Sequence, residues 1–210
     1  MKNPMIVAFE GIDGSGKSTT LNEVSKMLRA QDIDHICVSE TRHDALTEHI
    51  FAPIRNRAGD LDGRTQQLLI HAMRRYVDLT VIAPALAKGQ LVLVDRYYLS
   101  TLVYQDDPEL TRALQPIAIP NPSPVIYMLF DLPAKTAMAR LKKRPEQLDL
   151  YDRQEEEIHE RRRQAYLQYA LTEHGLAEYV QVLNASQPTS SLADQVMQSL
   201  TAILSRAEME

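Results

Sequence analysis

The chain has 210 residues, of which 44% are apolar and 24% are charged, and its 23 basic and 28 acidic side chains give a formal net charge of −5. This length predicts one domain spanning residues 1–210, and the apolar content excludes a largely disordered chain. The acidic balance argues against a protein that coats nucleic acid, so we expect no nucleic-acid partner. A local positive pocket can still bind small anions.

Cysteine usage and the N-terminal sequence indicate the compartment. Cys37 is the only cysteine, which excludes an internal disulfide, and its apolar neighbours Ile36 and Val38 suggest a small core residue. Residues 1–4 lead directly into a strand-like segment without the apolar region of a secretory signal, and no uncharged stretch has membrane-spanning length. We therefore expect a cytoplasmic protein with no membrane partner.

Short apolar runs rich in β-branched residues alternate with longer helical patterns. The apolar runs predict strands at 5–9, 36–38, 91–94, 125–130 and 179–183. The helical patterns predict helices at 17–30, 45–56, 64–88, 133–143, 154–174 and 190–206. This alternation predicts an α/β fold in which a five-stranded parallel sheet is flanked by helices on both faces.

Two segments interrupt this alternation. The stretch 105–124 contains five prolines, which argues against long regular structure there. The stretch 141–153 contains Lys142, Lys143 and Arg144 ahead of an acidic helix start, and it predicts a short mobile lid.

A phosphate-binding pattern stands between the first predicted strand and the first predicted helix. Residues 11–18 read GIDGSGKS and satisfy G-x-x-x-x-G-K-[ST] in the context that this motif requires. Glycines let backbone N–H groups turn toward phosphate oxygens, and the helix N-terminus adds positive potential. Lys17 can then bridge the β- and γ-phosphates and Ser18 can bind Mg²⁺, whereas a chance glycine-rich turn is the alternative. Nucleotide binding is expected at Gly11, Ile12, Asp13, Gly14, Ser15, Gly16, Lys17, Ser18 and Thr19.

A second candidate site lies at the end of the predicted strand 91–94. Asp95 and Arg96 follow this strand directly, at the sheet edge where ligands bind in open α/β folds. Asp95 can hold Mg²⁺ or accept a hydrogen bond from Ser18, and Arg96 can bind an acceptor phosphate through two hydrogen bonds. A surface ion pair is the alternative. We interpret Asp95 as an orienting and metal-binding residue and not as a general base, because phosphoryl transfer to a phosphate oxygen depends on positioning.

Four segments occur in an order typical of one kinase family. Residues 9–19 read FEGIDGSGKST, and residues 95–105 read DRYYLSTLVYQ. The other two segments are Arg74 with PALAKG at 84–89, and DRQE at 152–155 with Arg163 and Tyr166-Leu167. Over about residues 5–187 the chain resembles the thymidylate kinases (dTMP kinases), which are P-loop nucleoside monophosphate kinases.

The resemblance implies the reaction ATP + dTMP → ADP + dTDP, with Mg²⁺, in pyrimidine deoxynucleotide biosynthesis, and it implies a homodimer. In one family subtype the position of Gly14 carries an arginine. Because this chain has glycine there, the resemblance implies that a catalytic arginine comes from the lid. The lid candidates are Arg140, Arg144 and Arg153, with Lys143 as a weaker one. The residues expected to be catalytic are Lys17, Asp95, Arg96, Arg144 and Arg153, and the expected metal ligands are Ser18 and Asp95.

The resemblance also implies roles in the acceptor pocket. Arg74 and Arg96 match arginines that hold the acceptor monophosphate, Gln105 matches a glutamine that reads the base, and Asp13 matches an acid that contacts the deoxyribose. The expected substrate residues are Asp13, Glu40, Arg42, Ile70, Arg74, Arg96, Ser100 and Gln105.

The chain departs from the family pattern at three places. The loop R-E-P-G-G is replaced by SETRH at 39–43, which keeps Glu40 and offers Arg42 in place of the lost arginine. The phenylalanine that stacks on thymine corresponds to Ile70, which has no π-face. A Pro-Asp pair ahead of the fourth strand becomes Pro124-Val125.

These departures leave other acceptors open. One alternative is another pyrimidine deoxynucleotide, or an unphosphorylated deoxynucleoside with Glu40 as the base for its 5′-hydroxyl. A deoxynucleoside would leave Arg74 and Arg96 without an anion. The other alternative is a P-loop nucleotide switch without transfer activity, which has no need of the lid arginines or of Gln105.

Overall fold

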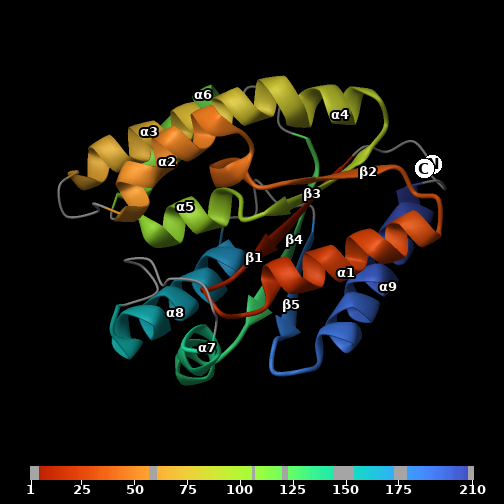
Figure 1. Cartoon of the computed structure of the whole chain (residues 1–210). Helices are drawn as coiled ribbons and strands as arrows, with labels where there is room; N and C mark the ends of the chain where they lie inside the picture. The colour runs from red at the N-terminus through yellow and green to blue at the C-terminus, as the bar shows by residue number, and fades with distance from the viewer. Residues whose placement is uncertain are drawn as a thin grey trace.

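The structure is a computed structural model that describes residues 5–56, 61–105, 107–119, 123–143, 154–172 and 179–207, with side chains described up to residue 205 (Figure 1). At its centre is a sheet of five parallel strands in the order β2-β3-β1-β4-β5. The strands are β1 (Ile6–Glu10), β2 (His35–Val38), β3 (Leu91–Asp95), β4 (Val125–Asp131) and β5 (Tyr179–Asn184). This sheet confirms the α/β fold and the parallel arrangement predicted from the sequence.

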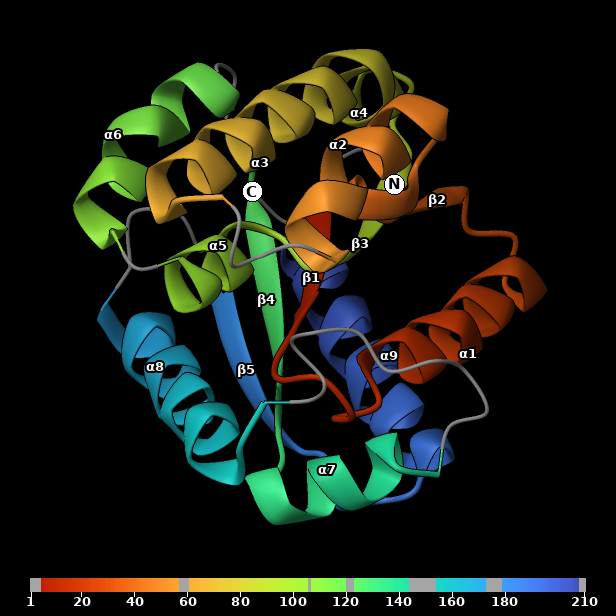
Figure 2. The ribbon, with the colours of Figure 1, turned by 60° about the vertical axis from the view of Figure 1, so that its left-hand side comes forward.

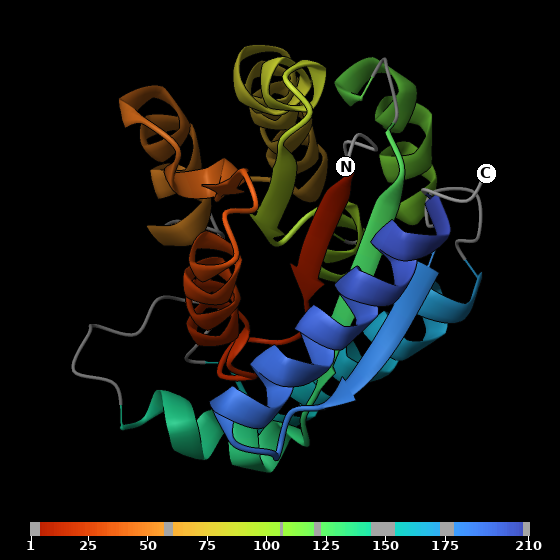
Figure 3. The same cartoon turned by 90° about the vertical axis from the view of Figure 1, so that its right-hand side faces the viewer.

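Helices cover both faces of the sheet. They are α1 (Lys17–Ala30), α2 (Ala45–Asn56), α3 (Gly63–Val77), α4 (Ala83–Ala87), α5 (Tyr98–Tyr104), α6 (Pro108–Ala118), α7 (Ala134–Leu141), α8 (Glu156–Thr172) and α9 (Thr189–Ala207). Helices α1 and α9 pack side by side on one face of the sheet (Figure 2). Helices α5 and α8 lie on the opposite face, behind the sheet in Figure 3. None of the described helices is long and apolar enough to span a membrane.

The hydrophobic core is centred on the three inner strands. β1, β3 and β4 are buried along almost their whole length, which explains their uninterrupted apolar sequences. β2 and β5 form the two edges and are only partly buried. Cys37 on β2 is exposed, so its interpretation as a core residue is wrong. An edge strand has a neighbour on one side only, so its side chains are more accessible to water than those of the inner strands.

Two helix predictions need correction. The predicted helix 64–88 consists of α3 and α4 joined by a π-helical turn at Asp78–Ile82. The expectation of irregular structure after Gln105 is wrong, because α6 occupies much of that segment. Pro108 stands in the first turn of α6, where its missing N–H leaves no bond unmade, and Asp107 caps the helix by accepting from the Leu110 N–H at 3.0 Å.

The carboxyl edge of the sheet gathers the turns that follow three neighbouring strands. The glycine-rich loop follows β1, a 3₁₀ turn at Glu40–Arg42 follows β2, and Arg96 follows β3. Because β2, β3 and β1 are adjacent and parallel, all three turns meet at one edge. In such sheets this edge is where ligands bind.

Candidate active site

At two positions of the glycine-rich loop a side chain would clash with neighbouring backbone. Gly11 and Gly14 have φ angles of +138° and +80°. A Cβ on Gly11 would lie 2.6 Å from the Phe130 carbonyl oxygen, and a Cβ on Gly14 would press on the backbone carbonyl of Ala137 in α7. The loop is therefore held between β4 and α7, with its end at the N-terminus of α1.

Lys17 lies over this loop, and its amino group contacts the backbone of the loop. Its Nζ donates to the Ile12 carbonyl oxygen at 2.8 Å, and its side chain is almost completely buried. Burial and the nearby positive charge of Arg96 lower the pKa of Lys17 to about 8. A phosphate oxygen that takes the place of the Ile12 carbonyl would accept from a lysine already in position.

Ser18 and Asp95 meet as the sequence suggested. The Ser18 hydroxyl donates to the Asp95 carboxylate at 2.5 Å, across 77 positions of sequence. No cluster of three or more His, Cys, Asp or Glu side chains with metal-ligand geometry occurs in the described ranges. Mg²⁺ in nucleotide sites is typically bound by one or two carboxylates together with substrate phosphates and water, so this hydroxyl–carboxylate pair fits such a site.

Arg96 connects the end of β3 to the glycine-rich loop. Its Nη2 forms an ion pair with Asp13, and its Nη1 donates to the Gly11 carbonyl oxygen at 3.1 Å and to the Tyr166 hydroxyl at 3.0 Å. Arg96 has a positive φ of 69°, which non-glycine residues rarely adopt. Its conformation therefore depends on these contacts.

Asp13 remains ionised in this setting. Burial would raise its pKa, but the positive charges of Arg96 and Lys17 outweigh that effect and hold the pKa of Asp13 well below its usual range. The Tyr104 hydroxyl also donates to Asp13, at 2.7 Å. The acid in the loop is thus an anion with fixed partners.

Glu10 is a positioning residue that the sequence analysis did not single out. It is fully buried at the end of β1 and accepts from the N–H groups of Tyr97 and Ser100, at 2.8 and 3.2 Å, and from the Ser100 hydroxyl at 2.5 Å. Burial raises the pKa of Glu10. The sequence did contain a signal for this role, namely an acidic residue at the end of an otherwise apolar strand. A carboxylate buried there needs hydrogen-bond partners at the sheet edge.

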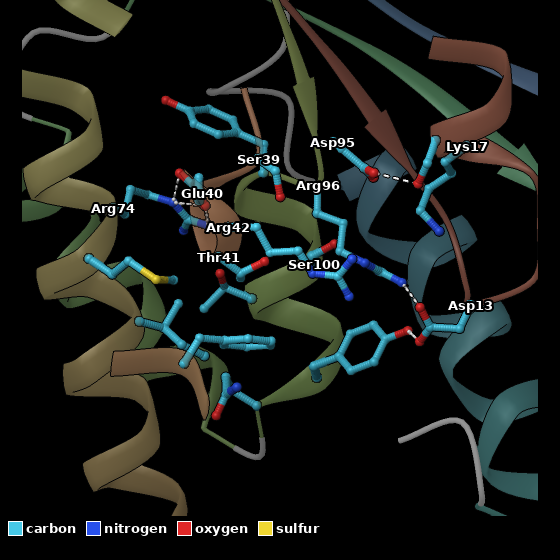
Figure 4. Close-up of a pocket in the computed structure, with 18 of the residues that line it drawn as sticks. Asp13, Lys17, Ser39, Glu40, Thr41, Arg42, Arg74, Asp95, Arg96 and Ser100 are labelled. Carbon is cyan, nitrogen blue, oxygen red and sulfur yellow. Dashed lines mark hydrogen bonds and ion pairs between the residues drawn. The ribbon is translucent and has the colours of Figure 1, made fainter. Parts of the chain in front are cut away.

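Glu40 and Arg74 form a buried ion pair on the other side of the pocket. Arg74 donates from Nε to Glu40 Oε1 at 2.8 Å and from Nη2 to Oε2 at 2.7 Å. Its Nη1 is buried without a hydrogen-bond partner among the described residues. In Figure 4 this pair lies opposite Asp13 and Lys17, with Arg96 and Ser100 between them. Glu40 neutralises Arg74 and leaves it one nitrogen that can donate to a ligand.

A single pocket brings the expected acceptor residues together. Its lining includes all eight of them, namely Asp13, Glu40, Arg42, Ile70, Arg74, Arg96, Ser100 and Gln105. Lys17, Ser18 and Asp95 line the same pocket. The Arg42 side chain is exposed and has no hydrogen bond or ion pair within the described ranges, so its charge is available to a ligand. Arg144 and Arg153 lie outside the described residues.

A second cavity opens on the far side of the glycine-rich loop. It is lined by Gly14, Gly16, Thr19, Thr20, Arg140, Ser186, Gln187, Pro188, Thr189 and Leu192. Arg140, an expected lid residue, lies here instead and donates to the Ala185 carbonyl oxygen at 3.0 Å. The turn between β5 and α9 was missed as a site element, since no residue pattern in it signals binding.

Comparison with known proteins identifies the family. The sequence profile described as Thymidylate kinase matches residues 9–196. The chain is 33% identical to a thymidylate kinase of Desulfovibrio desulfuricans, covering 96% of this chain and 97% of that protein. It is 34% identical to a thymidylate kinase of Magnetococcus marinus, with 89% and 90% covered, and 31% identical to one of Geobacillus thermodenitrificans, with 98% and 92% covered. The chain belongs to the thymidylate kinase family and is a nucleoside monophosphate kinase, a phosphotransferase.

Proposed function

We propose that this enzyme transfers the γ-phosphoryl group of ATP to the 5′-phosphate of dTMP, giving ADP and dTDP. The observation that carries this proposal is the Asp13–Arg96 ion pair, which joins the phosphate-binding loop to the acceptor pocket. A donor phosphate on the loop and an acceptor phosphate at Arg96 would therefore be neighbours. The new bond forms between an acceptor phosphate oxygen and the γ-phosphorus, and the bond from that phosphorus to the β–γ bridging oxygen breaks.

On the donor side, residues 11–19 are proposed to bind the ATP phosphates. Lys17 exchanges the Ile12 carbonyl for phosphate oxygens, and the second cavity, with Arg140 beside it, holds the adenosine part. Ser18 and Asp95 would hold Mg²⁺, which supplies positive charge to the donor phosphates when it is bound. The pairing of Ser18 with Asp95 supports these two ligands because both side chains already face the same point.

On the acceptor side, Arg96 and Arg42 are proposed to supply the positive charge for the monophosphate. Arg74 is proposed to donate a hydrogen bond to the acceptor from Nη1. The positive charge of Arg74 is balanced by Glu40. Gln105, which is buried at the pocket wall, is proposed to read the base. Asp13 is proposed to accept from the deoxyribose hydroxyl, which suits an anion with fixed partners.

The state of Glu40 disfavours a deoxynucleoside as the acceptor. A 5′-hydroxyl would need a general base, whereas an ionised phosphate oxygen attacks without one. Both Glu40 carboxylate oxygens accept hydrogen bonds from Arg74, so this carboxylate is not available as that base.

The lid arginines Arg144 and Arg153 are proposed to stabilise the transferring phosphoryl group. The packing of Gly14 against α7 supports this proposal, because there is no room at that position for the arginine that one family subtype has. The positive charge required in the transition state must then come from elsewhere, and the segment 144–153 is the candidate.

Domain organisation and assembly also belong to the proposal. Residues 1–210 are proposed to act as one kinase domain, since the chain aligns with its relatives over nearly their full lengths. A homodimer is proposed from the family, and exposed apolar side chains such as Leu68 on α3 and Ile117 on α6 support a protein contact on these two adjoining helices. The cytoplasmic location remains a prediction from the sequence.

A coupled assay of ADP release tests the proposed reaction. We expect dTMP to give the highest kcat/KM among dTMP, dUMP, dCMP, dGMP and thymidine, and EDTA to abolish turnover. Turnover on thymidine without turnover on dTMP would overturn the proposal. ADP release at the same rate without any acceptor would instead favour the nucleotide switch.

A further inference from the structure

One aromatic ring that lines the acceptor pocket is engaged neither by another ring nor by a guanidinium group in the described part of the chain. Among the described residues three aromatic side chains line it: Phe51, Tyr97 and Tyr104. The ring centre of Tyr97 lies 5.3 Å from Arg74 Cζ, and that of Tyr104 lies 5.0 Å from Arg96 Cζ. Both tyrosine rings are therefore engaged by guanidinium groups. Phe51 has no ring or cation contact within the described ranges, so its π-face is available to a ligand.

Helix periodicity explains why Phe51 faces the pocket. Thr47 and Ile54 are the buried residues of α2, and Phe51 lies four residues after the first and three before the second. It therefore belongs to the inward face of α2, which packs on α3. On α3, Ile70 and Met73 also line the pocket, so α2 and α3 together form an apolar wall there.

We propose that Phe51 is the platform on which the acceptor base stacks, supplied by α2 in place of the family aromatic that Ile70 replaces on α3. The proposal rests on the proposed function and assigns the base-binding part of that site. A pyrimidine needs an apolar surface for its face and hydrogen-bond partners at its edge. The apolar wall adjoins Arg74, whose Nη1 is unpaired among the described residues, and Gln105, so both requirements are met within one pocket.

Removal of the ring tests this assignment. Phe51→Leu should raise the KM for dTMP about tenfold, in line with the stacking contribution of one aromatic to one base, and leave the KM for ATP unchanged. Phe51→Tyr keeps the ring and should retain the wild-type KM. Leu46→Ala, an exposed position of the same helix outside the pocket, is the matched control and should change neither KM.

Moving the ring from one helix to the other separates stacking from a packing defect. Ile70→Phe in the Phe51→Leu background should restore the dTMP KM to within about threefold of wild type, because the ring then returns from α3. An unchanged dTMP KM in Phe51→Leu, or an equal rise in the ATP KM, would overturn the assignment. Failure of the double variant to recover would do the same.

A ligand without a base provides the final discrimination. Calorimetry with 2-deoxyribose 5-phosphate should give the same affinity for wild type and Phe51→Leu, whereas dTMP should bind the variant more weakly. Equal losses for both ligands would show a general defect of the pocket and overturn the assignment. The series uses the nucleotide that the wild-type enzyme prefers in the acceptor panel. If the wild-type enzyme prefers a nucleotide other than dTMP, the proposed function is overturned, and the same variants then test Phe51 with that nucleotide.

Discussion

Glu40 accepts hydrogen bonds from both Nε and Nη2 of Arg74, at 2.8 and 2.7 Å, where neither side chain is more than 6% exposed. The pair ties the turn after β2 to α3 across 34 positions of sequence. Glu40→Gln leaves the charge of Arg74 buried without a counter-charge. We expect the free energy of unfolding, measured by urea titration, to fall by about 3 kcal/mol.

A double variant distinguishes this charge effect from a loss of packing. Glu40→Gln combined with Arg74→Gln removes both charges and should recover part of the stability lost in the single variant. If the double variant loses as much stability as Glu40→Gln and Arg74→Gln lose together, the two side chains are not directly coupled.

Arg96 combines a strained backbone with a functional side chain, so stability and activity should separate there. Arg96→Gly relieves the positive φ, whereas Arg96→Ala keeps it. The glycine variant should therefore be more stable than the alanine variant by about 1 kcal/mol. Both should show a raised acceptor KM and a lowered kcat with little change in ATP affinity. Equal stability of the two variants would show that the backbone at this position is not under strain.

Gly14 and Gly63 offer a matched pair of glycine substitutions. Gly14→Ala places a Cβ against the backbone of α7 and at a φ of +80°, so it should cost at least about 2 kcal/mol and suppress transfer. Gly63 begins α3, and a Cβ there meets nothing within 4 Å. Gly63→Ala should therefore raise stability by about 0.5 kcal/mol without changing kinetics. Thermal unfolding and the coupled assay measure both effects, and equal behaviour of the two variants would contradict the packing described for the loop.

Asp78 should make stability depend on pH. This side chain in the π-helical turn is 4% exposed, and its Oδ2 has no partner among the described residues. Burial and the charge of Glu40 raise the pKa of Asp78 from 3.8 to about 6. The folded state thus binds more protons than the unfolded state between about pH 4 and pH 6, so this residue lowers the free energy of unfolding as pH rises through that range.

Replacement of Asp78 by asparagine should remove that dependence. Asp78→Asn is expected to stabilise the protein by about 3 kcal/mol at pH 7 and to have little effect near pH 3.5. The exposed Asp194 on α9 provides the control, since Asp194→Asn makes the same chemical change at the surface. Urea unfolding at several pH values checks this, and a stabilisation that does not change with pH would contradict the raised pKa.

The sequence predicted the parts of the structure whose determinants are local. The glycine-rich loop is recognisable because its spacing, its lysine and its flanking strand and helix lie within one short stretch. β1, β3 and β4 are recognisable because burial on both faces selects apolar residues at every position. The start of α6 shows the limit of this reasoning. Pro108 was counted as a helix breaker, but a proline in the first turn of a helix favours that helix.

Features that depend on distant segments were not predictable in the same way. The pairing of Glu40 with Arg74 requires the turn after β2 to meet the middle of α3, and no local pattern specifies this contact. The apolar pattern of α2 predicts which residues face inward, but not that this face borders the acceptor pocket, so Phe51 was missed. Cys37 was misplaced for a related reason, because strand order decides which strand is an edge.

The two halves of the site differ in how they are encoded. The donor loop is one uninterrupted stretch in which Gly11 packs against β4 and Gly14 against α7, so a replacement of either glycine disturbs the loop. Apart from Asp13 of that loop, the acceptor pocket takes its side chains from separate elements: the turn after β2, α2, α3, the turn after β3, and α5 with the residue that follows it. Side chains that are not ion-paired with another element, such as Phe51 on α2 and Ile70 on α3, can be exchanged while the others stay in place. Such an enzyme can change the nucleotide that it accepts one side chain at a time during evolution while it keeps the same phosphoryl donor.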